Sequence, residues 1–211
     1  MQSILAKRVV PVVVVDKLED AVPLAEALMA GGLNVVEVTF RTAAAADAIR
    51  QIRSRVPGMV VGAGTLLTPD QVGQAVDAGA AFGVAPGFNE PVVRRSTELQ
   101  LPFIPGVMTP SEIERALACD LRLLKFFPAE AAGGVQMLKA LAGPYAHTGA
   151  RFIPLGGVSP ANMVEYLSLP MVGAVGGTWI ADRKLIQARA WAEITRLTQA
   201  ALALAGGVAQ G

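Results

Sequence analysis

Two ionisable side chains stand in otherwise apolar segments of this sequence, and both would suit chemistry on a carbonyl group. Lys125 lies in LRLLKFFPAE between Leu124 and Phe126, where desolvation favours the neutral, nucleophilic amine over the ammonium. Glu37 lies in NVVEVTFRT, and a carboxyl group in an apolar pocket suits general acid and base catalysis. The alternatives are a lysine that buries only its stem and a structural ion pair of Glu37 with Lys125 or Arg41.

Three further residues would complete a site for a substrate that carries a carboxylate. Arg41 offers a planar fork of donors that fits a carboxylate, although a solvated surface arginine is the alternative. Thr65 follows Gly62 and Gly64 in VGAGTLL, where glycine lets the backbone approach a ligand. Its hydroxyl would orient a carboxylate or carbonyl, or would instead cap a helix or turn. Pro86 belongs to a Pro-Gly turn and would shape the pocket.

Two glycine pairs late in the chain indicate a phosphate site. Gly156-Gly157 and Gly176-Gly177 each follow an apolar run, and glycine lets backbone N–H groups approach an anion closely. Thr178 would add a hydroxyl donor. Glycine also serves ordinary turns, but the last two expected strands end in these pairs, and (β/α)8 barrels often bind phosphate in the loops that follow those strands.

The elements that would position these residues follow from an alternation of short apolar runs with longer segments of helical period. The expected strands are 9–15, 33–39, 59–63, 80–85, 102–105, 121–126, 151–155 and 172–176. Helix-start signals stand between strands at Thr68-Pro69-Asp70, Thr109-Pro110-Ser111-Glu112 and Ser159-Pro160-Ala161-Asn162. The pattern predicts repeated βαβ units with parallel strands.

Eight such units in 211 residues predict an α/β fold, a (β/α)8 TIM barrel that forms a single domain over 1–211, with a loose tail at 205–211. Function in such a barrel collects at the carboxyl ends of the strands, and Lys125 stands late in the sixth. An open doubly wound sheet is the alternative. The GxGxxG sequence that would mark a dinucleotide site in that fold does not follow the first strand.

Composition excludes several classes of function. Apolar residues make up 53% and charged residues 17%, which excludes a disordered chain. The formal net charge is +1 and like charges form no run, so we expect neither nucleic acid nor a membrane surface as a partner. Acidic residues at Asp16 and Glu19 follow the apolar run 9–15, unlike a signal peptide. With Cys119 as the single cysteine, we expect a cytoplasmic protein.

Metal and cofactor chemistry is not expected from this sequence. His147 is the only histidine, and no cluster of His, Cys, Asp and Glu has the spacing of metal ligands. A serine hydrolase is equally disfavoured, because no GxSxG sequence is present. We therefore expect no cofactor and no metal.

Several longer segments resemble the 2-keto-3-deoxy-6-phosphogluconate (KDPG) aldolases, from Val9 to about Leu197. They are VVPVVVVDKLEDAVPLAEAL, EVTFRT, GAGTLLTPDQ, LKFFPAEAAGG and GGVSPAN. The resemblance implies that Lys125 forms a Schiff base and that Glu37 is the general acid and base. It also implies that Arg41, Thr65 and Pro86 shape the keto-acid site, and that phosphate binds at Gly156, Gly157, Gly176, Gly177 and Thr178.

The same resemblance implies a class I aldolase that releases pyruvate and glyceraldehyde 3-phosphate, without a cofactor, as a cytoplasmic homotrimer. Two residues depart from the family pattern: Thr178 replaces an expected serine, and Leu155 replaces an expected threonine. The alternatives are an aldolase for 4-hydroxy-2-oxoglutarate (KHG) or for the galactonate epimer. A phosphosugar isomerase or epimerase and a non-catalytic barrel are further alternatives, because fold alone does not fix function.

Overall fold

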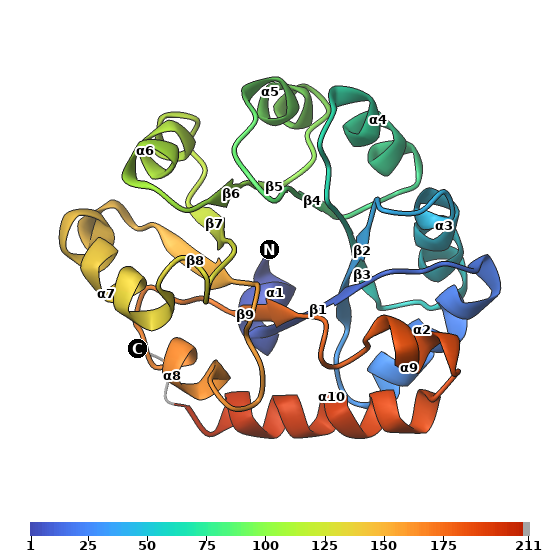
Figure 1. Ribbon diagram of the computed structural model, residues 1–211. Coiled ribbons are helices and arrows are strands. Elements are labelled where there is room, and N and C mark those ends of the chain that lie inside the picture. The colour runs from blue at the N-terminus through green and yellow to red at the C-terminus, as the bar shows by residue number, and fades with distance from the viewer. Residues whose placement is uncertain (209–211) are drawn as a thin grey trace.

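Parallel strands form the centre of the molecule and helices surround them (Figure 1). The computed structural model describes residues 1–208, apart from the side chains of Gln2 and Ser3. The strands are β1 (Val9–Val13), β2 (Val35–Thr39), β3 (Val60–Gly64), β4 (Phe82–Val84), β5 (Phe103–Ile104), β6 (Gly106–Val107), β7 (Leu123–Phe126), β8 (Arg151–Pro154) and β9 (Val175–Gly177).

The helices follow the strands along the chain, as the alternation in the sequence predicted. They are α1 (Gln2–Lys7), α2 (Ala21–Ala30), α3 (Ala45–Arg55), α4 (Pro69–Asp77), α5 (Glu90–Glu98), α6 (Pro110–Ala118), α7 (Gly134–Tyr145), α8 (Met163–Leu167), α9 (Arg183–Gln187) and α10 (Trp191–Gly206), with short 3-10 helices η1 (Leu18–Asp20) and η2 (Ala146–Thr148).

The strands pair in two sheets in which every pairing is parallel. One has six strands in the order β5-β4-β3-β2-β1-β9, and the other has three in the order β6-β7-β8. Backbone hydrogen bonds also join β8 to the segment before β9, with Phe152 N–H donating to Met171 O at 2.7 Å and Gly173 N–H donating to Phe152 O at 2.9 Å. The predicted α/β class with a parallel sheet is confirmed.

The expected strand at 102–105 is two short strands in the structure, β5 and β6, which flank Pro105. Proline has no N–H group, so it cannot donate to a neighbouring strand and it interrupts the ladder. Its carbonyl is still used, because it accepts the N–H of Lys125 at 2.9 Å. The prediction of eight strands is therefore wrong here, since residues 1–208 form nine.

Two of the three expected helix starts are confirmed. Thr68 and Thr109 each accept the N–H of the third helical residue through their side chains, and both helices have a capping box. The third start is wrong by a few residues, because α8 begins only after Asn162. Ser159 forms a turn instead, in which its N–H donates to Asn162 Oδ1 at 2.8 Å.

The strands bury both of their faces, which explains their nearly continuous apolar sequences. One apolar cluster joins side chains from strands of both sheets, and it includes Val10, Val35, Phe82 and Ile153. Ile4 of α1 joins this cluster. A larger cluster fills the space between the strands and the surrounding helices. An ionisable group placed among the enclosed side chains is therefore held in an apolar environment.

The helix α10 contains the beginning of the segment predicted to be a loose tail, Ala205 and Gly206. Arg8 donates from Nη1 to the carbonyl of Val208 at 2.8 Å, and the rest of the predicted tail, 209–211, lies outside the described residues. Neither α10 nor any other helix within residues 1–208 combines the length and the apolar character that a membrane crossing needs.

Candidate active site

Lys125 and Glu37 come together from strands that are not neighbours, β7 and β2. Both residues are buried, with 5% and 2% of their surfaces exposed, and Lys125 Nζ lies 3.7 Å from Glu37 Oε1. This distance is too long for a direct hydrogen bond, and Glu37 Oε1 has no hydrogen-bond partner among the described residues. A buried carboxylate oxygen without a partner is costly, so the pair is arranged to receive a water molecule or a substrate atom.

Small and aromatic neighbours fix the positions of these two side chains. A Cβ atom on Gly64 would lie 2.1 Å from Glu37 Oε1, so only glycine leaves room for the carboxylate at this point of β3. Lys125 Nζ lies 5.2 Å from the centre of the Phe127 ring, within the range of a cation–π contact. The same packing therefore orients both groups and keeps solvent away from them.

The two residues line a cavity of about 290 Å³ at the carboxyl ends of the strands, which is the size of a small metabolite site. The structure brings nine of the ten predicted site residues to this cavity: Glu37, Arg41, Thr65, Pro86, Lys125, Gly156, Gly157, Gly177 and Thr178. Gly176 does not line it. A Cβ atom on Gly176 would lie 2.9 Å from Leu155 Cγ, so this glycine makes room for Leu155.

Thr39 is a lining residue that our sequence interpretation missed. Its hydroxyl donates to the carbonyl of Val13 at 2.9 Å and accepts a hydrogen bond from Arg41 Nε at 3.2 Å. It therefore anchors an otherwise exposed arginine at the mouth of the cavity. The strand periodicity could have predicted this position. Thr39 stands two residues after Glu37, and alternate residues of a strand point to the same side.

Thr65 and Pro86 also line this part of the cavity, and both have an unusual backbone environment. Thr65 has a φ of 59°, a left-handed conformation that costs free energy for a residue other than glycine. Pro86 lies against Gly106, where a Cβ atom would come within 2.1 Å of the Pro86 carbonyl oxygen. The close approach of Pro86 to β6 therefore requires glycine at position 106.

Gly156 and Gly157 form a loop whose N–H groups are left available. Their φ angles are +91° and +87°, a conformation that favours glycine. The carbonyl of Gly156 accepts the N–H of Glu130 at 3.0 Å, and that of Gly157 accepts Asn162 Nδ2 at 3.1 Å. Within residues 1–208 neither glycine N–H donates a hydrogen bond, so both can bind an anion at the cavity wall.

A buried tyrosine supports this loop from behind. The hydroxyl of Tyr166, a fully buried residue, donates to Glu130 Oε1. A Cβ atom on Gly157 would lie 2.4 Å from Glu130 Cγ, so the glutamate stem packs directly against the loop. Desolvation, together with the neighbouring Glu130, raises the pKa of the Tyr166 hydroxyl, which keeps it a hydrogen-bond donor.

Apolar side chains form the remaining wall of the cavity, and the sequence gave no reason to single most of them out. Val12, Phe127 and Val158 lie there and resemble ordinary core residues. Leu155, the residue noted for replacing a threonine, is 5% exposed and also lines the cavity. Its side chain has no hydrogen-bonding group, so this wall cannot bind a substrate hydroxyl through it.

Comparison with known proteins places the chain among aldolases. Residues 1–197 match the family model for KDPG and KHG aldolases. The KHG/KDPG aldolase of Escherichia coli strain K12 is 48% identical over 194 residues, which cover 92% of this chain and 90% of the relative.

Solved structures give the same result. A KDPG aldolase from Legionella pneumophila, with pyruvate captured as a covalent carbinolamine, is 43% identical with a TM-score of 0.91, covering 94% of this chain and 96% of that one. The enzyme of Zymomonas mobilis ZM4 with 3-phosphoglycerate is 39% identical with a TM-score of 0.89, covering 99% and 97%.

Proposed function

This chain belongs to the KDPG and KHG aldolase family and is a class I aldolase, and from this premise we propose how its residues perform the cleavage. Its substrate is 2-keto-3-deoxy-6-phosphogluconate, and its products are pyruvate and glyceraldehyde 3-phosphate. The observation that carries the assignment of roles is the buried pair of Lys125 and Glu37, 3.7 Å apart in a substrate-sized cavity. An isomerase or a non-catalytic barrel would not form a covalent imine on this amine.

The reaction begins when neutral Lys125 Nζ attacks the C2 ketone of the substrate. Glu37 supplies the proton with which the resulting carbinolamine loses water, and a protonated imine forms. The imine accepts the electron pair of the C3–C4 bond as Glu37 removes the proton of the C4 hydroxyl, and glyceraldehyde 3-phosphate leaves. The remaining enamine takes a proton at C3, and water then hydrolyses the imine to pyruvate and the free amine.

The two ends of the substrate are bound by different parts of the cavity. Arg41 and Thr65 hold the carboxylate, because a guanidinium fork and a hydroxyl fit its oxygens, and Pro86 shapes this end. The phosphate binds to the N–H groups of Gly156 and Gly157, with Thr178 as a hydroxyl donor. The unpaired glycine N–H groups support this orientation of the substrate.

We also propose that the two sheets form one closed (β/α)8 barrel and one domain. The support comes from the hydrogen bonds that join Lys125 to Pro105 and Phe152 to Gly173 across the two gaps between the sheets. Closure accounts for the enclosed apolar cluster that surrounds the lysine and glutamate. It also explains why the active-site residues meet although β2 and β7 belong to different sheets.

The assembly and location follow the family expectation. We propose a homotrimer in the cytoplasm, and light scattering on the purified chain would give the mass of three copies if this is correct. A monomer at the concentration of the activity assay would contradict the proposal.

Substrate preference is tested by measuring pyruvate release from KDPG, its galactonate epimer and unphosphorylated KHG. We expect a higher kcat/KM for KDPG than for KHG, because the glycine loop contributes only when a phosphate is present. The gap between the two epimers should be small, since Leu155 offers no group that distinguishes the C4 hydroxyls. Higher kcat/KM for KHG would contradict the role of the glycine loop, while failure to release pyruvate from all three would contradict the function.

A further inference from the structure

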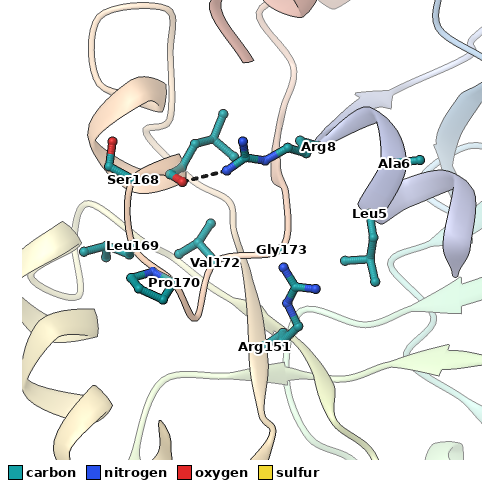
Figure 2. A pocket seen from close by; sticks show the side chains of 10 residues that line it. Leu5, Ala6, Arg8, Arg151, Ser168, Leu169, Pro170, Val172 and Gly173 are labelled. Atoms are coloured by element: carbon teal, nitrogen blue, oxygen red, sulfur yellow. Dashed lines mark hydrogen bonds between the residues drawn. The ribbon is translucent and has the colours of Figure 1, made fainter. Parts of the chain in front are cut away.

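A second large cavity lies at the other end of the strands from the active site. It has a volume of about 610 Å³, and we call it the basic pocket (Figure 2). It is lined by Leu5, Ala6, Arg8, Arg151, Leu167, Ser168, Leu169, Pro170, Val172 and Gly173. Arg151 is the first residue of β8 and Arg8 directly precedes β1, so both arginines stand at amino ends of strands. No residue is shared with the catalytic cavity.

Arg8 is a buried cation that has no acidic partner within residues 1–208. It is only 8% exposed, and its guanidinium donates to two neutral carbonyls, Leu167 O at 2.7 Å and Val208 O at 2.8 Å. No carboxylate of residues 1–208 lies within ion-pair distance of it. A buried charge is costly unless it is paired, and a guanidinium has five N–H donors. Charge and donors therefore remain for a ligand.

Arg151 brings a second guanidinium to the same cavity. Figure 2 shows Arg8 and Arg151 on either side of Val172 and Gly173. A Cβ atom on Gly173 would lie 3.5 Å from Arg151 Nε and 2.6 Å from Leu5, so glycine lets both side chains pack against the backbone here. Arg151 likewise has no ion pair among the described residues.

The surroundings of the two arginines strengthen the positive potential. An adjoining cavity of about 370 Å³ shares Ala6 and Arg8 with the basic pocket and adds Lys7. No described aspartate or glutamate lines either cavity, although the chain has 17 acidic residues against 18 basic ones. The described lining of both cavities is therefore basic and neutral, which is the arrangement expected for an anion site.

We propose that the basic pocket binds a small phosphorylated metabolite. A phosphomonoester carries nearly two negative charges at neutral pH, which matches two guanidinium groups, and arginine forks fit its oxygens. The apolar wall of Leu5, Leu169 and Pro170 would cover the carbon skeleton. The volume lies within the range of small-molecule sites. This site is separate from the aldol cleavage and does not depend on it.

The test follows the methyl groups of Leu5 and Leu169 by NMR while the full chain is titrated with glycerol 3-phosphate. These two leucines line only the basic pocket, so phosphate bound in the catalytic cavity does not interfere. We expect saturable shifts in the native protein and at least about ten-fold weaker binding in Arg151→Ala, because charge-assisted hydrogen bonds are lost. Arg151 is exposed at a strand end, so the variant should keep the native melting temperature.

The control variant is Arg94→Ala, which removes an exposed arginine from the outer surface of α5 and should bind as tightly as the native protein. The proposal is overturned if the leucine methyl groups do not respond to glycerol 3-phosphate, or if Arg151→Ala and Arg94→Ala bind it equally well. Malonate tests the ligand class. Tighter binding of this dicarboxylate than of glycerol 3-phosphate would also overturn the assignment to phosphate.

Discussion

In the proposed mechanism, the two halves of the catalytic cavity bind the two ends of the substrate by different means. The keto-acid half, which includes Glu37, Thr65 and Lys125, presents side-chain functional groups, and two of these are buried ionisable groups. The phosphate half, at Gly156 and Gly157, presents backbone N–H groups in a glycine conformation. Bond cleavage needs groups that gain and lose protons, whereas an anion needs only fixed donors.

This difference predicts that substitutions in the two halves will affect two reactions differently. Pyruvate has no phosphate group, and an imine–enamine cycle on Lys125 would exchange the hydrogens of its methyl group with solvent. Deuterium exchange into pyruvate therefore reports on the keto-acid half alone. Pyruvate release from KDPG reports on both halves.

Replacing the nucleophile should have the largest effect. In Lys125→Ala both pyruvate release and deuterium exchange should fall by about 10⁴-fold or more, because no imine can form. The two reactions are measured by a coupled pyruvate assay and by NMR in D2O. Lys139→Ala, which removes an exposed lysine from α7, is the matched control and should retain native rates. Deuterium exchange at the native rate in Lys125→Ala would show that the imine does not form on Lys125.

Replacing the proton-transfer group should have the next largest effect. Glu37→Gln keeps the shape of the side chain but cannot act as a base, so we expect both reactions to slow by roughly 10²- to 10⁴-fold. Loss of pyruvate release with unchanged exchange would show that Glu37 acts only on the part of the substrate that leaves. That result would contradict its placement in the keto-acid half.

Damage to the phosphate half should separate the two reactions. Gly157→Ala introduces a Cβ atom 2.4 Å from Glu130 Cγ at a φ of +87°, and the strain should displace the loop. We expect kcat/KM for KDPG to fall by about 10- to 100-fold, with deuterium exchange unchanged. Gly143→Ala is the control, because nothing lies within 4 Å of the added atom. An equal loss of both reactions would mean that the halves are not independent.

Removing the support behind the loop should have the smallest effect. Tyr166→Phe deletes the hydroxyl that donates to Glu130. The free energy of one hydrogen bond corresponds to a change of about 2- to 10-fold in a binding constant. We expect this change in the KM for KDPG, while kcat and deuterium exchange stay at native values. Tyr145→Phe, which loses a hydroxyl bonded to Glu114 at 3.1 Å, should leave all of them unchanged. A fall in kcat alone would exclude the supporting role.

The residues of the two halves could not be predicted from the sequence equally well. Lys125 and Glu37 could be found because charged residues are rare in strands that are covered on both faces. Gly156 and Gly157 could be placed in the correct loop, but Gly176 and Gly177 belong to β9, and Gly176 packs against Leu155. Thr39 was missed because a threonine in a strand is ordinary. Its role depends on Arg41, whose position only the folded chain defines.

Features that depend on long-range packing could not be predicted. Tyr166 and Glu130 are 36 residues apart, and a tyrosine in an apolar helix segment reads as a core residue. Arg8 and Arg151 are far apart in the sequence, and only the folded chain places both in one cavity. Pro105 was included in a single strand, although the proline interrupts the pairing on which that strand depended.

The central claim is that the buried amine of Lys125 forms a covalent imine, and trapping it is the most direct test. The native protein is incubated with pyruvate and borohydride, digested and analysed by mass spectrometry. We predict a reduced pyruvate adduct on the peptide that contains Lys125, and none in Lys125→Ala. A native protein that releases pyruvate from KDPG but carries no adduct, or carries it on another lysine, would contradict this account.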